Sequence, residues 1–285
     1  MKELVVLSGK GGTGKTSIVG SFAALARSKV LADCDVDASD LHLLLEPRPQ
    51  QENKFWSGQV AVIDEDTCNN CGLCQYLCRF EAIKDFKVDI ASCEGCGFCF
   101  QVCPVEAIRM EENLSGRWYV SDTRYGPLVH ARLGIAQENS GKLVAVVRQQ
   151  SRIIAEEMKL DYIITDGPPG IGCPVISSLS GASIALLVTE PTLSAIHDLE
   201  RVLGVCHHFG VQPVVCINKY DINEDNSLQI EKYCGVQGIK VAARIPFSNV
   251  FTEAILHGRP IVEYTQNRVS ALIETLFYQI LNCLD

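Results

Sequence analysis

The chain has 285 residues, of which 47% are hydrophobic, so it can bury the core of one large α/β domain and still carry a small insert. Its formal net charge of −9 argues against a nucleic-acid partner, because a surface that binds nucleic acid is basic. No apolar run reaches transmembrane length, and the N-terminal residues have the pattern of a core strand rather than of a signal peptide. We therefore expect a cytoplasmic protein that contacts neither nucleic acid nor membrane.

Cysteine is the most unusual feature of the composition. The chain has 14 cysteines, and eight of them fall at regular spacing between Cys68 and Cys103. A secreted disulfide scaffold would be shorter and would carry a signal peptide, whereas clustered cysteines in a cytosolic chain indicate a metal site.

A glycine-rich loop lies between the first predicted strand, residues 4–7, and the first predicted helix, residues 17–26. Its sequence, from Gly9 to Thr16, is GKGGTGKT and fits the phosphate-binding pattern G-x-x-x-x-G-K-[ST] in the context that the pattern requires. Such a loop points backbone N–H groups at phosphates, its lysine (Lys15) reaches the β and γ phosphates, and its threonine (Thr16) ligates Mg²⁺. The residues expected to contact a nucleoside triphosphate are Gly11, Gly12, Thr13, Gly14, Lys15, Thr16 and Ser17.

Lys10 gives this loop a special form. The segment KGGTGKT resembles the deviant phosphate-binding loop of the MinD/ParA family, which includes the nitrogenase iron protein. In that family the early lysine crosses a dimer interface and contacts the partner subunit's nucleotide. The resemblance implies that Lys10 acts in catalysis together with Lys15, that the nucleotide is ATP, and that the protein closes on ATP as a homodimer or as a heterodimer with a paralogue. A solvated surface lysine is the alternative interpretation of Lys10.

The second predicted strand, residues 29–32, is followed by an acidic segment from Asp33 to Asp37. Carboxylates just past a strand end that face the phosphate loop can hold Mg²⁺ or orient the attacking water. The position resembles the first switch of the family, which implies that Asp35 serves both Mg²⁺ and catalysis. Asp33 is a weaker candidate, and Asp37 is equally well explained as the cap of a short helix beginning near Ala38. The polar, proline-rich stretch 46–53 predicts a linker.

The cysteine-rich segment is an internal duplication. The run C-x2-C-x2-C-x3-C occurs twice with a constant offset, and Glu81-Ala82-Ile83 is repeated as Glu106-Ala107-Ile108. The segment resembles a bacterial ferredoxin with two [4Fe–4S] clusters, in which the fourth cysteine of each run crosses to the other cluster. The resemblance implies one cluster on Cys68, Cys71, Cys74 and Cys103, and a second on Cys78, Cys93, Cys96 and Cys99. A zinc ribbon would use two cysteine pairs instead. Arg79 departs from that family, which usually has proline after the fourth cysteine.

Acidic side chains dominate the same segment. Residues 58–112 carry ten Asp or Glu against four Lys or Arg. An anionic face suits docking to a basic redox partner protein, although an ordinary solvated surface explains the charges equally well.

A further strand, residues 162–166, ends at Asp166 and is followed by Gly167-Pro168-Pro169-Gly170. This resembles the second switch of the family, which implies that Asp166 holds Mg²⁺ through water and that the Gly170 amide senses the γ-phosphate. A plain turn after a strand is the alternative.

The last strands are predicted at 184–188, 214–217 and 241–245, and a helix at 266–281. The segment from Asn218 to Asp221 looks like the base-recognition loop of P-loop proteins, which implies that Asn218 contacts adenine. In the family the loop after the last strand covers the base, here from Pro246 through residues 247–249. The final helix lacks the interleaved Lys and Arg of a membrane-targeting helix.

Together these patterns predict an α/β fold: a mostly parallel, doubly wound sheet of the P-loop type with an inserted small α+β ferredoxin domain. The predicted bounds are 1–57 and 113–285 for the ATPase domain and 58–112 for the insert. The favoured function is an ATPase that hydrolyses ATP to ADP and phosphate and couples this to electron transfer through two [4Fe–4S] clusters. An assembly or carrier ATPase for iron–sulfur clusters is the alternative, and a ParA- or MinD-type positioning ATPase is a third.

Overall fold

The computed structural model describes residues 1–134 and 139–284, and the chain divides into two compact units. Unit 1 contains residues 1–52, 118–131 and those from 140 onward. Unit 2 contains residues 53–117 together with the segment that begins at Arg132 and ends at Asn139. The insert predicted at 58–112 lies within the first segment of unit 2.

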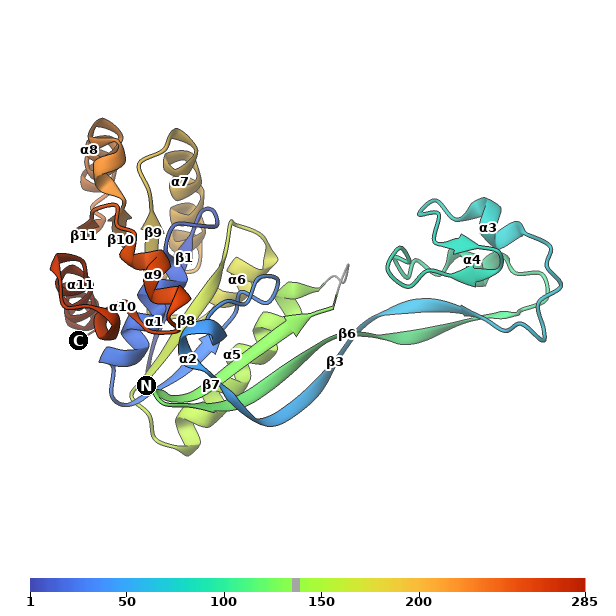
Figure 1. Cartoon of the computed structure of the whole chain (residues 1–285). Helices are drawn as coiled ribbons and strands as arrows, with labels where there is room; N and C mark the ends of the chain where they lie inside the picture. The colour runs from blue at the N-terminus through green and yellow to red at the C-terminus, as the bar shows by residue number, and fades with distance from the viewer. Residues whose placement is uncertain (135–138, 285) are drawn as a thin grey trace. The chain divides into compact units, whose positions relative to one another are not determined.

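Unit 1 is built on a sheet whose strand order is β11-β10-β9-β1-β8-β2-β7-β6-β3 (Figure 1). The order is far from the sequence order because helical crossovers connect the strands. Every printed pairing from β11 to β7 is parallel, so the prediction of a mostly parallel α/β sheet is confirmed. The strands are β1 (Lys2–Ser8), β2 (Lys29–Asp33), β3 (Arg48–Ile63), β6 (Ile108–Thr123), β7 (Gly126–Leu133), β8 (Tyr162–Pro169), β9 (Ile184–Thr189), β10 (Gln212–Asn218) and β11 (Lys240–Ile245).

Helices cover both faces of this sheet, which explains why its central strands are apolar along their whole length. In β1, Leu4 and Val6 belong to one hydrophobic cluster, while Val5 and Leu7 belong to another on the opposite face. The first cluster includes residues of α1 (Lys15–Leu25), α2 (His42–Leu45), α9 (Val250–Leu256), α10 (Ile261–Tyr264) and α11 (Arg268–Leu284). The second includes residues of α6 (Cys173–Leu179), α7 (Leu193–His208) and α8 (Glu224–Val236). The sheet is therefore doubly wound.

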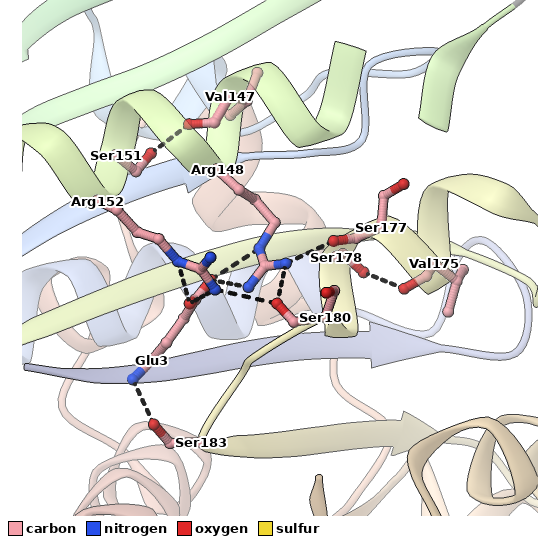
Figure 2. A network of polar contacts seen from close by, with 10 residues as sticks. All are labelled: Glu3, Val147, Arg148, Ser151, Arg152, Val175, Ser177, Ser178, Ser180 and Ser183. Atoms are coloured by element: carbon pink, nitrogen blue, oxygen red, sulfur yellow. Dashed lines mark hydrogen bonds and ion pairs between the residues drawn. The ribbon is translucent and has the colours of Figure 1, made fainter. Parts of the chain in front are cut away.

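A buried ion network fixes α5 (Ser140–Glu157) and α6 to β1 (Figure 2). The Arg148 guanidinium lies 2.5 Å from a Glu3 carboxylate oxygen and donates to the carbonyl oxygens of Ser177 (2.6 Å) and Ser180 (2.7 Å). Arg152 binds the other Glu3 oxygen at 2.8 Å. Both Glu3 and Arg148 are almost fully buried, so their charges depend on this pairing.

Replacing Arg148 by methionine should therefore destabilise the protein. Glu3 would keep only the pairing with Arg152. The Ser177 carbonyl would lose the hydrogen bond from Arg148, whereas the Ser180 carbonyl would keep one from Arg152 at 3.1 Å. We expect a loss of about 3 kcal/mol in the free energy of unfolding, measured by denaturant titration. Arg152→Met, which removes a half-exposed partner, should cost much less, and equal losses for the two variants would contradict this account.

Two local predictions differ from the structure. The predicted linker 46–53 is largely strand, because β3 begins at Arg48; its first residues are exposed on both faces, so they lack the apolar alternation that marks a strand. Asp37 caps no helix, since α2 begins at His42.

The C-terminal helix α11 buries one face against the rest of unit 1. This face includes Val269, Ile273 and Phe277. Within residues 1–134 and 139–284, we find no helix with the length and apolar character needed to cross a membrane.

Unit 2 repeats one small motif. Its helices α3 (Leu73–Leu77) and α4 (Phe98–Val102) follow Gly72 and Gly97, which adopt nearly the same left-handed backbone conformation, with φ of 76° and 71°. Neither helix contains a buried residue. The buried apolar pairs Ala82-Ile83 and Ala107-Ile108 occupy equivalent places in the two halves, and the short strands β4 (Ile83–Lys84) and β5 (Lys87–Val88) pair antiparallel. The internal duplication seen in the sequence is thus also a duplication of backbone conformation.

Candidate nucleotide site and cysteine-lined cavities

The phosphate loop connects β1 to α1 at the carboxyl edge of the sheet. Gly14 precedes α1 with φ of 89°, and a β-carbon on it would come within 2.6 Å of the Asn218 amide nitrogen, so both its backbone conformation and its close packing require glycine. The loop borders a cavity of about 440 Å³. This cavity is lined by Ser8, residues 11–17, Asp35, Ala38, Asp40, Pro169, Asn218, Lys219, residues 247–249, Phe251, Thr252 and Ile255.

Most of the residues predicted to bind nucleotide therefore surround one cavity, although they come from distant parts of the sequence. Four predicted residues do not line it: Lys10, Asp166, Gly170 and Pro246. Asp166 lies next to the cavity, in contact with Lys15, and Gly170 and Pro246 are direct neighbours of lining residues.

Lys15 is buried among carboxylates. Its Nζ lies 2.5 Å from Asp166 Oδ1 and 3.7 Å from Asp35 Oδ2. Burial lowers the pKa of Lys15, but the carboxylates of Asp166 and Asp35 outweigh this effect, so the pKa is raised and the side chain stays charged. One oxygen of Asp166, Oδ2, is buried without a hydrogen-bond partner among the described residues. A buried carboxylate oxygen without a partner, beside the phosphate loop and Thr16, is suited to the coordination shell of Mg²⁺.

Two acidic residues at the end of β2 and just after it, Asp33 and Asp35, have different roles. The carboxylate of Asp33 is buried and accepts hydrogen bonds from the Ser39 hydroxyl (2.6 Å) and the Asp35 backbone (3.1 Å), so it holds the turn. Burial, reinforced by the nearby Asp166, raises the pKa of Asp33 to about 7. Asp35 instead lines the cavity, and burial raises its pKa to about 6 against the opposing charge of Lys15.

Lys10 forms an ion pair while its side chain remains 34% exposed. Its Nζ lies 2.7 Å from Glu190 Oε1 and 3.1 Å from the Thr192 hydroxyl. Glu190 also binds Lys219 Nζ at 2.9 Å, and Lys219 Nζ donates to the Gly12 carbonyl at 2.9 Å. Burial raises the pKa of Glu190, but hydrogen bonds from Lys10 and Lys219 outweigh this effect and hold the pKa below its ordinary value.

Sequence reasoning missed Glu190, although one signal was present. Glu190 directly follows β9, and the carboxyl ends of parallel strands meet at one edge of the sheet. Asp35, Asp166 and Asn218 lie at the same edge, but family resemblances had indicated them.

Asn218 is 1% exposed and bonded to the phosphate loop. Its Nδ2 donates to the Thr13 carbonyl at 2.8 Å, and its Oδ1 accepts from the Lys219 backbone at 3.0 Å. The predicted adenine contact thus lies at the cavity wall and also supports the loop that would hold the phosphates.

Two cavities in unit 2 are each lined by four cysteines. The larger, of about 320 Å³, is lined by Cys78, Cys93, Cys96 and Cys99 among largely apolar neighbours. The other, of about 10 Å³, is lined by Cys68, Cys71, Cys74 and Cys103. Each set combines three cysteines of one run with the fourth of the other run. In the second set the Ala107 N–H donates to Cys103 Sγ at 3.3 Å.

The cysteines are not gathered around single points. In the part of the chain that the structure describes, no three Cys, His, Asp or Glu side chains converge closely enough to hold one metal ion. The first cavity has a volume of about 320 Å³, whereas the second has only about 10 Å³, so a bulky group in the second would require its walls to move apart.

Comparison with known proteins identifies the family. Residues 4–261 match the sequence profile of the CobQ/CobB/MinD/ParA nucleotide-binding domain. The chain belongs to this family. The prediction of a MinD/ParA-type P-loop ATPase that binds ATP is therefore confirmed, and nucleotide with Mg²⁺ is the usual ligand pair of such a domain.

Individual relatives in this nucleotide-binding family agree with that assignment. An uncharacterised protein of Methanocaldococcus jannaschii is 36% identical over 227 residues, which cover 79% of this chain and 80% of the relative. The septum site-determining protein MinD of Bacillus subtilis is 24% identical, with 98% of this chain and 89% of that protein covered. Among solved structures, the cell division ATPase MinD of Pyrococcus furiosus superposes with a TM-score of 0.61 at 19% identity, covering 99% of this chain and 98% of that one. The last likeness shows the shared fold alone.

Proposed function

We propose that this MinD/ParA-type ATPase is an iron–sulfur protein in which unit 2 carries two [4Fe–4S] clusters and ATP turnover in unit 1 controls electron transfer through them. The observation that carries the proposal is the grouping of the eight cysteines. Two cavities are lined by four cysteines each, in the crossed combination expected of a two-cluster ferredoxin.

The chemistry of unit 2 fits such clusters. Thiolates are the usual ligands of iron–sulfur clusters, and N–H donors to the sulfurs, such as Ala107 N–H to Cys103, help to set cluster potentials. A cluster is wider than an ion, which is consistent with thiols that stand around cavities instead of a single point. Unit 2 also buries few apolar side chains, and units of this size usually need a metal group or disulfides for stability. When bound, the clusters would supply one-electron transfer.

In the nucleotide site, we propose that Lys15 exchanges its contact with Asp166 for the β and γ phosphates of ATP. This exchange would free the Asp166 carboxylate for Mg²⁺, beside Thr16 and Asp35, and the two carboxylates would orient the attacking water. Gly170, in the loop after β8, would respond to the γ-phosphate through its backbone N–H. Asp166 thus connects the presence of nucleotide to the conformation of that loop.

Dimerisation on ATP would require Lys10 to leave Glu190. By its resemblance to the family, Lys10 would contact the nucleotide of a second subunit, a homodimer partner or a paralogue. Glu190 therefore competes with that nucleotide for the lysine. The protein is expected to be cytoplasmic, with a redox protein as its electron-transfer partner.

Glu190→Gln should consequently strengthen ATP-dependent dimerisation. The substitution removes the carboxylate charge that holds Lys10 while keeping the side-chain size. Because the ion pair between Lys10 and Glu190 is only partly buried, we expect the dissociation constant of the dimer to fall only about two- to fivefold. Analytical ultracentrifugation with Mg-ATP measures this constant. Glu200→Gln, on the exposed side of α7, serves as the matched control. Unchanged or weaker dimerisation of the Glu190 variant would count against the competition between Glu190 and nucleotide.

The iron–sulfur assignment is tested on protein purified without oxygen. We expect about eight iron atoms and as many acid-labile sulfides per chain, retained during incubation with a chelator. Protein that holds no iron would overturn the assignment. Rapid transfer of the clusters to an apo-acceptor would instead favour a cluster carrier, the alternative function.

A further inference from the structure

The segment that follows β10 has the pattern Asn-Lys-x-Asp, and its last residue, Asp221, has no role in the function proposed above. It lies in the short 3-10 helix η1 (Tyr220–Ile222) and is exposed. Asn218 and Lys219 line the nucleotide cavity, whereas Asp221 does not. Its carboxylate must therefore act outside the cavity.

Asp221 is bonded to the loop that follows β11. Its Oδ1 accepts a hydrogen bond from the Phe247 backbone N–H at 2.6 Å. The strand β11 itself also contacts η1, because the guanidinium of Arg244 lies 4.5 Å from the centre of the Tyr220 ring. The Ser227 hydroxyl donates to the Tyr220 carbonyl at 2.8 Å, which attaches η1 to α8. The loop after β11 is thus held by η1 directly through Asp221, next to a strand that η1 also contacts.

This loop forms part of the cavity wall, and it follows Ile245, which pairs with Asn218 in the sheet. Phe247, Ser248 and Asn249 line the cavity, and Phe247 remains 54% exposed although it is a large apolar side chain. An exposed aromatic ring beside a nucleotide cavity offers a stacking face for a base. The position of that ring depends on the backbone of Phe247, whose N–H group is hydrogen-bonded to Asp221.

The contact between Asp221 and Phe247 also affects which purine base the site accepts. A carboxylate only accepts hydrogen bonds, so it would suit the N–H donors on the pairing edge of guanine. Adenine presents one donor group and one acceptor, which a backbone C=O and N–H can satisfy. The Asp221 carboxylate is turned toward Phe247 instead of into the cavity, and so it is not offered to a base.

We propose that Asp221 is a positioning residue for base recognition: it holds the loop 246–249 against the adenine base. This inference rests on the nucleotide site proposed above and extends it to the base.

The test compares ligands with and without a base. Affinities of the full-length protein for ATP, GTP and inorganic tripolyphosphate are measured in Mg²⁺ by calorimetric titration. For the wild type we expect ATP to bind at least about tenfold more tightly than GTP, because guanine donors would be left unpaired. Asp221→Ala should weaken ATP binding about three- to tenfold and leave tripolyphosphate binding within about twofold. Asp221→Asn keeps an acceptor oxygen and should stay close to the wild type, and Asp225→Ala is the matched exposed control.

Four results would overturn the inference. The first is an unchanged affinity of Asp221→Ala for ATP. The second is an equal loss of affinity for tripolyphosphate and ATP in that variant, which would make Asp221 a general structural residue. A wild-type preference for GTP that Asp221→Asn abolishes would mean that the carboxylate reads guanine directly. Failure of ATP and tripolyphosphate alike to bind the wild type would overturn the nucleotide site itself, and with it this role of Asp221.

Discussion

Lys15→Ala is expected to reduce the affinity for ATP by about a hundredfold or more. The ammonium group is the only cation within the carboxylate cluster of Asp35 and Asp166 that the structure describes at salt-bridge distance, and it lies at the start of α1 where the phosphates would be held. Its removal deletes charge-assisted hydrogen bonds to the phosphates and leaves two carboxylates that repel them. Equilibrium binding of a fluorescent ATP analogue measures the change.

The control for this experiment is Lys10→Ala. Lys10 lies outside the cavity and is held by Glu190, so this variant should bind ATP within about threefold of the wild type and lose ATP-dependent dimerisation. If Lys15→Ala bound ATP normally, the phosphates could not lie at the loop from Gly9 to Thr16. If Lys10→Ala lost ATP binding as severely, the two lysines would not have separate roles.

Paired cysteine substitutions should reveal the crossed ligation of the clusters. Cys68 and Cys103 line the same cavity, so Cys68→Ala with Cys103→Ala should remove one cluster and leave about four iron atoms per chain. Cys68→Ala with Cys78→Ala affects both cavities and should leave almost no iron. Iron analysis of anaerobically purified variants measures the difference.

The opposite pattern would show that each run of four cysteines binds its own cluster. In that case the Cys68 and Cys78 variant would keep half of its iron and the Cys68 and Cys103 variant would lose nearly all. Equal loss in both variants would mean that unit 2 cannot hold either cluster once one is gone. Replacing Cys173, which lies in unit 1 and lines neither cavity, is the matched control and should leave the iron content unchanged.

The sequence predicted the parts of the nucleotide site that obey local rules. The strand before the phosphate loop is apolar, the loop has fixed glycine and lysine spacing, and parallel strands bring Asp35, Asp166 and Asn218 to the same edge of the sheet. The MinD/ParA resemblance supplied the roles expected of Lys10, Asp35 and Asp166, and a resemblance to P-loop proteins supplied that of Asn218. The motifs themselves lie within short stretches of chain, so pattern and spacing are sufficient to locate them.

The remaining features depend on contacts between distant side chains. Tertiary packing produces the contacts of Glu190 with Lys10 and Lys219, and the contact of Asp221 with Phe247. The end of β9 indicates the edge of the sheet on which Glu190 lies, but no sequence spacing specifies these partners. The first residues of β3 were missed for a different reason: both faces of the strand are exposed there, so no apolar alternation records its presence. The Glu3–Arg148 network was likewise invisible, because it joins β1 to α5 across more than half of the chain.

The most direct test of an ATPase coupled to iron–sulfur clusters is electron paramagnetic resonance of anaerobically reduced protein, recorded with and without Mg-ATP. We expect signals from two interacting [4Fe–4S] clusters, and we expect Mg-ATP to change their shape or potential in the wild type but not in Lys15→Ala. Two clusters whose spectra and potentials do not change when Mg-ATP is added would contradict the coupling. The absence of any cluster signal would contradict the assignment of unit 2 as an iron–sulfur domain, and with it the proposed function.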